Sequence, residues 1–481
     1  AAFVNCKKLE SVDISNVTTI DEDAFYRCRS LKSISDLSNV KEIPMFAFYR
    51  CESLKSINIP NVITIGEMAF CYCAFDTIDL PKVETIGVDA FYSCGNLKSI
   101  NMPKVKTLGY EALMHCAFTS LNLPATLDTI GGYALSCNSG LKYITIDEAN
   151  ENFAVKDNVL YDKDFTKLIQ YPIGQEAKSI SVSNTVTTIG GGAFAECKYV
   201  ERVDMPNVEI IEREAFSNCM YLKSVNMPKV TAIETSAFFQ CKNLNSINIP
   251  NVTKIESGAF ESCSNLQKVV LGNKVDSIED EAFSECTSLD TFRIITAMPP
   301  ILGKIGVLTD APSDMLIQVP CGASSLYERI EGWNNFKNYE EVAPEVTVMS
   351  NDEKMGVVVL DRQATCEDPT AEIEAMPRLG YEFVKWSDES TENPRVVTVE
   401  DEDITLTAIF QKVGTDVENV GIEGAIIYSD GNTLYVDGLD SEYQIYSTTG
   451  ALIYSGNANQ ITLAQGIYII RYNGMSEKVI L

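Results

Sequence analysis

The chain has 481 residues, 45% of them apolar, which is long enough for several domains and excludes disorder along its whole length. Its 38 basic and 67 acidic side chains give a net charge of −29, a field that repels nucleic acids and anionic membranes. There is one histidine, His115, the side-chain type on which acid–base and metal chemistry most depend. No run approaches the roughly 20 apolar residues of a membrane helix. We therefore expect no nucleic-acid partner, no membrane insertion and no enzyme activity.

A repeat fills residues 1–293, and its copies are marked by regularly spaced cysteines. Segments 54–73, 222–241 and 244–263 follow the pattern L-x-x-I-x-I-P-x-V-x-x-I-x-x-x-A-F-x-x-C. The alternation in L-x-x-I-x-I predicts a short strand with one buried face, and the proline, which lacks an N–H, ends it. One coil cannot cover its own apolar side, so the copies are expected to stack. The marking cysteines are Cys6, Cys28, Cys51, Cys73, Cys94, Cys116, Cys137, Cys197, Cys219, Cys241, Cys263 and Cys286.

This repeat resembles the BspA-type leucine-rich repeats of bacterial surface proteins. The resemblance implies a mainly β solenoid with short parallel strands on a concave face and irregular or short helical turns on a convex face. Residues 147–172 interrupt the period and look like the irregular coil of that family. Residues 294–343 are expected to cap the last coil, with Trp333 and Phe336 wedged against it.

Two small β domains are expected after the cap. Residues 344–411 resemble the β-grasp-like repeats related to internalin B-repeats, with Tyr381, Phe383 and Trp386 as core aromatics. Residues 417–481 alternate like a small β-sandwich. The ending of this segment resembles the sorting domains of type IX secretion, with Gly466, Tyr468, Lys478 and Leu481 in the expected places.

The expected location is the cell surface, the outer membrane or the extracellular space, because the resemblances point to exported bacterial proteins. Ala1–Phe3 fall in the middle of a repeat, so we expect a preceding segment that is missing here, and the lack of a signal peptide is uninformative.

The cysteines of the repeat are expected to form a ladder of buried free thiols. Cβ atoms stacked at the strand spacing of about 4.8 Å with parallel vectors are poorly placed for disulfides, and zinc-ligand spacing is absent. Cys137 follows Leu135 by two residues where the other copies have three. The pairing of Cys321 and Cys366 stays open. His115 precedes a ladder cysteine at a position that varies freely, so we expect it to be solvated, with no metal, cofactor or catalytic residue.

Two surfaces are candidate binding sites. The first, here named the polar strand face, takes the outward positions of the strands, where small hydroxyl and amide groups dominate and a solvated sheet is the alternative. It comprises Ser56, Asn58, Thr77, Asp79, Ser99, Asn101, Tyr143, Arg202, Asp204, Asn226, Asn248 and Arg293. The second, the tyrosine–arginine stripe, lies on the convex side, where packing under the return turn is the alternative. It comprises Tyr26, Arg27, Tyr49, Arg50, Tyr72 and Tyr92.

The predicted function is non-catalytic binding at the cell surface. The family resemblance favours an adhesin for host or microbial proteins. The alternative is capture of a glycan by the Ser/Asn rows of the polar strand face. An enzyme would require a carboxylate pair that the sequence does not reveal. The oligomeric state stays open.

Overall fold

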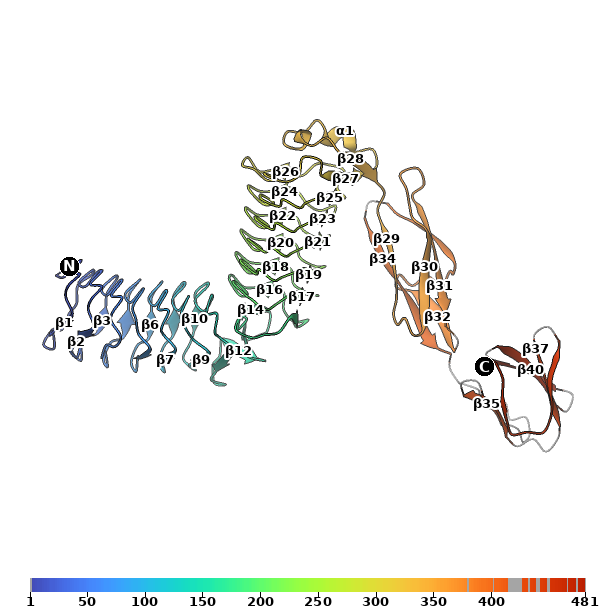
Figure 1. The fold of residues 1–481 in the computed structure, drawn as a ribbon, viewed down its shortest axis with the longest axis horizontal. Helices are drawn as coiled ribbons and strands as arrows, with labels where there is room; N and C mark the ends of the chain where they lie inside the picture. The colour runs from blue at the N-terminus through green and yellow to red at the C-terminus, as the bar shows by residue number, and fades with distance from the viewer. Residues whose placement is uncertain are drawn as a thin grey trace. The chain divides into compact units, whose positions relative to one another are not determined.

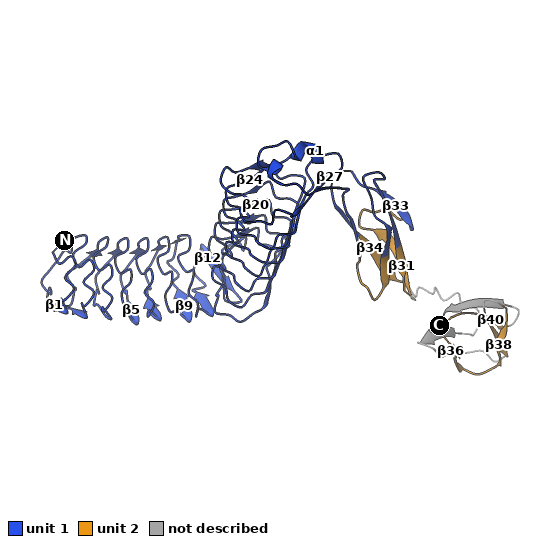
Figure 2. Cartoon of the chain, turned by 45° about the horizontal axis from the view of Figure 1, so that its top comes forward, with its two compact units in different colours: residues 1–348, 359–374, 392–406 blue, residues 349–358, 375–391, 407–481 orange. Residues whose placement is uncertain are grey.

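The computed structural model describes residues 2–378, 380–400, 402–413, 426–430, 433–437, 442–447, 450–464, 466–472 and 475–480. The chain forms two compact units (Figure 2). The first unit comprises residues 1–348, 359–374 and 392–406, and the second comprises 349–358, 375–391 and 407–481. No helix in the described ranges is long and apolar enough to cross a membrane.

The repeat contributes two rows of short strands, which Figure 1 shows aligned from coil to coil. Neighbouring strands within a row are parallel and in register, as in Thr77↔Ser99 and Thr85↔Thr107. The first row, from the L-x-x-I-x-I segments and the cap, consists of β1 (Ser11–Val12), β2 (Ser33–Ile34), β5 (Thr77–Asp79), β7 (Ser99–Asn101), β9 (Ser120–Leu123), β11 (Tyr143–Ile146), β15 (Ser179–Ser181), β17 (Arg202–Asp204), β19 (Ser224–Asn226), β21 (Ser246–Ile249), β23 (Lys268–Leu271), β25 (Thr291–Ile294), β27 (Leu316–Pro320) and β28 (Tyr339–Val342).

The second row lies on the return path, where the sequence predicted only turns. It consists of β3 (Glu42–Ile43), β4 (Thr64–Ile65), β6 (Thr85–Ile86), β8 (Thr107–Leu108), β10 (Thr129–Ile130), β16 (Thr188–Ile189), β18 (Ile210–Ile211), β20 (Ala232–Ile233), β22 (Lys254–Ile255), β24 (Ser277–Ile278) and β26 (Ile301–Leu302). Each of these strands ends on an inward apolar residue such as Ile65 or Ile86, which is fully buried.

Left-handed residues close the turn of each coil. We call the position of the repeat cysteine, or of Asn138 in one coil, the ladder position. The residue just before it has a positive φ, from 55° to 61°, in twelve coils. These residues are Asn5, Arg27, Arg50, Tyr72, Ser93, His115, Cys137, Glu196, Asn218, Gln240, Ser262 and Glu285. A non-glycine residue there costs about 1–2 kcal/mol. The stacked coils offset that cost, because backbone N–H groups of the turn donate to the next coil, as Arg27 N does to Tyr49 O at 2.7 Å.

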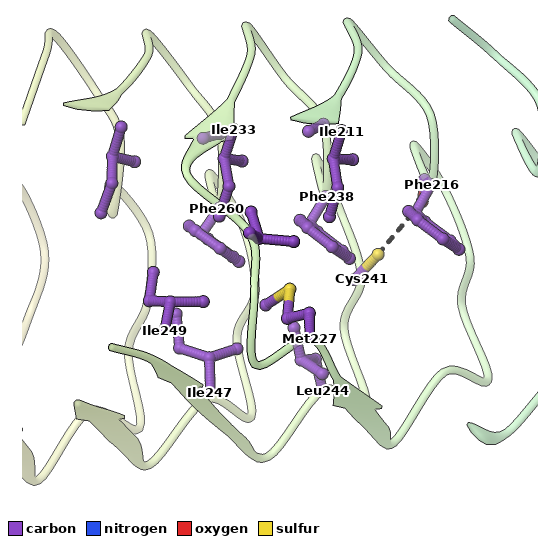
Figure 3. Close-up of a cluster of buried hydrophobic side chains, with 14 of the residues drawn as sticks. Ile211, Phe216, Met227, Ile233, Phe238, Cys241, Leu244, Ile247, Ile249 and Phe260 are labelled. Carbon is purple, nitrogen blue, oxygen red and sulfur yellow. Dashed lines mark hydrogen bonds between the residues drawn. The ribbon is translucent and has the colours of Figure 1, made fainter. Parts of the chain in front are cut away.

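Aromatic rings fill the core in a column, and the thiol of Cys241 lies beside it (Figure 3). Phe216, Phe238 and Phe260 stack with ring centroids 5.0 and 5.1 Å apart and planes within 3°. The Cys241 thiol donates to the carbonyl oxygen of Phe216 at 3.1 Å (Figure 3). Most other ladder thiols repeat this contact with a carbonyl of the preceding coil. The predicted ladder of buried free thiols is therefore confirmed with two exceptions: Cys6 is exposed, and Asn138 stands at the ladder position expected for the buried Cys137.

The irregular coil is a β-hairpin that joins the second row. It contains β12 (Phe153–Lys156), β13 (Val159–Asp162) and β14 (Lys167–Gln170). Strands β12 and β13 pair antiparallel, whereas β14 pairs with β16 in parallel. In this coil Tyr171 replaces the phenylalanine of the stacked column, and its ring stacks on Phe194 with centroids 5.0 Å apart. The buried side chains on either side of this coil form separate core clusters.

The cap covers the last coil with aromatic rings. It contains α1 (Ser324–Tyr327) and the 3-10 helix η1 (Trp333–Asn335), and strands β27 and β28 extend the first row. Trp333 is fully buried, its ring centroid lies 6.2 Å from that of Phe292, and it donates its indole N–H to Pro300 O at 2.9 Å.

Cys321 and Cys366, whose pairing the sequence left open, form a disulfide with Cα atoms 5.4 Å apart.

The remaining strands form small β-sheets. After the cap come β29 (Val346–Ser350), β30 (Gly356–Arg362), β31 (Thr370–Pro377), β32 (Tyr381–Trp386), β33 (Arg395–Thr398) and β34 (Ile404–Lys412), in sheets ordered β29-β34-β32 and β30-β31-β33. The last strands are β35 (Ile426–Asp430), β36 (Thr433–Asp437), β37 (Tyr443–Ser447), β38 (Leu452–Gly456), β39 (Gln460–Thr462), β40 (Ile467–Tyr472) and β41 (Met475–Ile480). The chain is thus a mainly β solenoid followed by small β domains. The predicted domain boundaries and the type IX resemblance stay predictions, and Leu481 lies outside the described residues.

Candidate binding surfaces

The polar strand face presents its side chains to solvent as predicted for the outward positions of the first row. Ten of its twelve residues are exposed, Asp204 is partly buried and Arg293 is buried. Several polar groups satisfy one another along the row: Asn101 donates to Asp79 at 2.6 Å and Asn226 donates to Asp204 at 2.7 Å. Such pairs reduce the number of hydrogen-bond donors and acceptors that a ligand could use, because part of the polar face is hydrogen-bonded within the chain.

Arg293 is not available on this face. Its side chain is 9% exposed, and its guanidinium donates to Asp403 at 2.7 Å and to Ala343 O at 3.2 Å. Sequence reasoning placed Arg293 outward because its strand position is outward. Segments that follow the repeat, including Ala343 and Asp403, bury the Arg293 side chain. The repeat pattern alone does not predict this burial. We leave Arg293 out of the proposed surface.

The tyrosine–arginine stripe is one continuous stack of rings. Tyr26 and Tyr49 stack face to face with centroids 5.0 Å apart, and Tyr49 to Tyr72 and Tyr72 to Tyr92 are edge contacts at 6.1 and 5.9 Å. The guanidinium of Arg27 lies 5.0 Å from the Tyr26 ring, and that of Arg50 lies 4.7 Å from the Tyr72 ring. These residues are partly buried, so each ring both packs on the coil and keeps an open side.

The arginines of the stripe keep unused hydrogen-bonding capacity. Within the described residues, the Nε atoms of Arg27 and Arg50 are buried and have no hydrogen-bond partner. Sequence reasoning also missed two members of the ring stack. Phe46, from a different position of the repeat, meets Tyr49 edge-on at 5.7 Å, and the His115 ring meets Tyr92 at 5.7 Å.

The ladder position predicted for Cys137 is wrong. Cys137 does not occupy the ladder position: Asn138 does, and its amide donates to Leu113 O at 3.0 Å where other coils use a thiol. The spacing of two residues after Leu135 was the signal of this shift. His115 is partly buried, and its side chain lies beside those of Cys137 and Glu196. Burial and then the carboxylates of Glu196 and Glu214 raise the pKa of the Cys137 thiol.

A hollow of about 430 Å³ lies beside the irregular coil, and sequence reasoning did not find it. Its lining includes Tyr110, Tyr133, Lys167, Glu212 and Arg213. Tyr133 donates its hydroxyl to Arg213 O at 2.7 Å, and Lys167 pairs with Glu212 at 2.5 Å. Burial and then the Glu111 carboxylate raise the pKa of Tyr110 to about 12. The charges of the lining are largely paired within the chain, so we assign no ligand to this hollow.

One carboxylate next to the stripe makes stability depend on pH. Burial, followed by the neighbouring Glu111, raises the pKa of Asp89 to about 6 from 3.8. A raised carboxylate pKa penalises folding above about pH 6, and the penalty is relieved as the pH falls toward 3.8. We expect Asp89→Asn to raise the urea midpoint at pH 7.5 and to have little effect by pH 4, measured by circular dichroism.

The control for this prediction is Asp13→Asn. Hydrogen bonds lower the pKa of Asp13, and the largest contribution is that of the Ser15 backbone N–H. The charged carboxylate therefore stabilises the fold at neutral pH, and this stabilisation is lost in acid. Asp13→Asn should therefore lower the midpoint at pH 7.5. A gain from Asp89→Asn that is equal at both pH values would contradict the assignment.

Coils with a parallel strand row, a leucine before most of the repeat strands and buried phenylalanine columns define a leucine-rich-repeat solenoid. Residues 1–74, 63–172 and 173–290 match the family model described as "BspA type Leucine rich repeat region (6 copies)". Because these matches cover more than half of the chain, the chain belongs to the BspA-type leucine-rich-repeat family. Residues 346–414 match the model of the "Divergent InlB B-repeat domain".

Solved structures support the same fold. A leucine-rich cell surface protein from Faecalibacterium prausnitzii A2-165 is 34% identical with a TM-score of 0.55, over 60% of this chain and 79% of that one. The pneumococcal vaccine antigen PcpA is 22% identical with a TM-score of 0.55, over 65% and 78%. A leucine-rich repeat protein from Eubacterium ventriosum is 19% identical with a TM-score of 0.51, over 61% and 87%. A comparison with curated proteins gives no match. The family suggests a repeat-based binding role.

Proposed function

We propose that this chain is a non-catalytic, exported surface protein that binds a host or microbial protein through the tyrosine–arginine stripe. The observation that carries the proposal is the stack of partly exposed Tyr26, Tyr49 and Tyr72 rings with guanidinium groups against them. Tyrosine and arginine dominate the energetics of protein interfaces. Stacking already restricts the tyrosine side chains, so binding a partner would cost little additional side-chain conformational entropy.

Export is supported by the disulfide and by the family. The Cys321–Cys366 bond is typical of proteins that fold in an oxidising compartment. The first solved relative is described as a cell surface protein. Delivery to the outer membrane by the type IX route remains part of the proposal alone.

The test is binding of the purified chain to parallel arrays of host matrix proteins, bacterial surface proteins and glycans. We expect a saturable protein ligand whose affinity falls at least about 30-fold in the double variant Tyr26→Ala/Tyr49→Ala, since one hot-spot tyrosine at the centre of an interface is worth about 2 kcal/mol or more. The matched control is Tyr221→Ala, because Tyr221 is 55% exposed and lies outside the stripe. Binding that is unchanged while the melting temperature falls would assign the stripe to packing and overturn the proposal.

A glycan is the second candidate ligand, because ten residues of the polar strand face are exposed and neighbouring strands that carry them, such as β5 and β7, pair in parallel register. Rows of hydroxyl and amide groups suit a polar extended ligand. A glycan hit should survive the loss of the stripe tyrosines. It should fail when Asn58, Asn101 and Asn226 are replaced by tryptophan, which fills the face without changing the core.

A further inference from the structure

Three side chains with metal-binding atoms meet where the irregular coil interrupts the repeat. His115, Cys137 and Glu196 each stand directly before the ladder position of their coil, and each is left-handed, with φ of 57°, 57° and 61°. A ring nitrogen, the thiol sulfur and a carboxylate oxygen all lie within 4.8 Å of one another. The sequence separates the first and last of these residues by 81 positions, which is 196 − 115.

The backbone explains how residues so far apart come together. The Cys137 coil and the Glu196 coil are adjacent here, because the buried Ser136 hydroxyl donates to Gly192 O at 3.0 Å. On the other side, His115 N donates to Ser136 O at 3.3 Å. The three coils are therefore held in order at this row, and the shift of Cys137 out of the thiol ladder accompanies the approach of its sulfur to within 4.8 Å of both the histidine nitrogen and the carboxylate oxygen.

The surroundings of the cluster favour a cation. Cys137 is buried, and a carboxylate oxygen of Glu196 lies within 4.8 Å of its sulfur. Arg213 is a nearby cation, and its guanidinium is already paired with Glu214 at 3.1 Å. The His115 ring is oriented by its edge contact with Tyr92 at 90°. The cluster thus combines one carboxylate with an imidazole and a thiol, three kinds of donor that bind divalent metal ions.

We propose that His115, Cys137 and Glu196 bind one Zn²⁺ ion that fastens the coils on the two sides of the irregular coil. Nitrogen, sulfur and oxygen ligands at about 2.0–2.3 Å are those of tetrahedral zinc. Such bonds place ligand atoms about 3.3–3.6 Å apart, so the side chains close by about 1 Å. The Cys137 thiol releases its proton to solvent as the zinc–sulfur bond forms. Three protein ligands leave a fourth position for water.

The test is titration of the full chain with Zn²⁺, and with Co²⁺ as a spectroscopic probe. The Cys6→Ser background removes the exposed thiol. We expect one ion per chain by equilibrium dialysis, a thiolate-to-cobalt charge-transfer band, and a melting temperature that rises with Zn²⁺. Removing a residue that only hydrogen-bonds to a metal ligand typically weakens metal binding by about 10–100-fold. Removing a ligand itself should cost at least as much, so we expect His115→Ala, Cys137→Ser and Glu196→Gln each to lower the zinc affinity at least about tenfold.

The matched control is Glu285→Gln, which removes a carboxylate at the same repeat position in another coil, where Ser262 donates to it at 2.6 Å. This variant should bind zinc like the parent chain. Glu196→Gln keeps the size of a partly buried side chain, so its fold can be verified without metal by the melting curve. Absence of the cobalt–thiolate band in the parent, or a band that persists in Cys137→Ser, would overturn the proposal.

Discussion

Replacing Phe238 by alanine should destabilise the repeat by about 3–5 kcal/mol, the usual cost of deleting a buried phenylalanine ring. The ring is fully buried and stacks on Phe216 at 5.0 Å and on Phe260 at 5.1 Å. Deletion therefore leaves a cavity in the middle of a column, and the neighbouring coils are held apart by their strand pairing, so they can close it only in part. The measurement is the shift of the urea midpoint at constant slope, followed by circular dichroism.

The adjacent Phe239 supplies the control for this prediction. It is the next residue of the same coil, has the same side chain, and is only partly buried. Phe239→Ala should cost clearly less than Phe238→Ala. Equal losses would mean that general hydrophobicity of the coil, and not the stacked column, determines stability.

Reduction of the Cys321–Cys366 disulfide should produce the second large loss of stability. The bond closes a loop with a sequence separation of 45 residues, for which the chain-entropy model gives about 4 kcal/mol. The cap contains the fully buried Trp333 and Tyr327, so we expect the unfolding midpoint of the cap, reported by tryptophan fluorescence, to fall when reductant is added.

The double variant Cys321→Ser/Cys366→Ser should unfold at the midpoint of the reduced parent and should no longer respond to reductant. Cys6→Ser should behave like the parent chain, since Cys6 is free and forms no disulfide. A parent chain whose midpoint is the same with and without reductant would show that the loop is already constrained when the cap unfolds.

The repeat could be predicted well from the sequence because its signal is periodic. Strands in register, buried phenylalanines and buried thiols all follow from residues that recur at fixed spacing, as at Phe238 and Cys241. The second strand row was missed because strands of two residues, such as Thr85–Ile86, leave no alternation to detect. Their pairing comes from stacking of coils and not from local propensity.

The candidate sites were harder to predict than the fold, because they depend on departures from the period. The tyrosine–arginine stripe repeats, so its alignment could be foreseen. The meeting of His115 with Glu196 could not, because it requires the irregular coil to bring two distant coils together. The cover over Arg293 likewise comes from Asp403, in a part of the chain that lies outside the repeat.

The position before each ladder residue gives this fold a capacity for diversification. Arginine, tyrosine, serine, histidine, cysteine, glutamate, asparagine and glutamine all occur there, and all adopt nearly the same left-handed backbone, with φ from 55° to 61°. The backbone is set by the coil and the side chain is free to differ. Substitutions along this column can therefore change the charge and shape of the surface while the backbone of the coil stays constant, so one scaffold can carry many different side-chain surfaces.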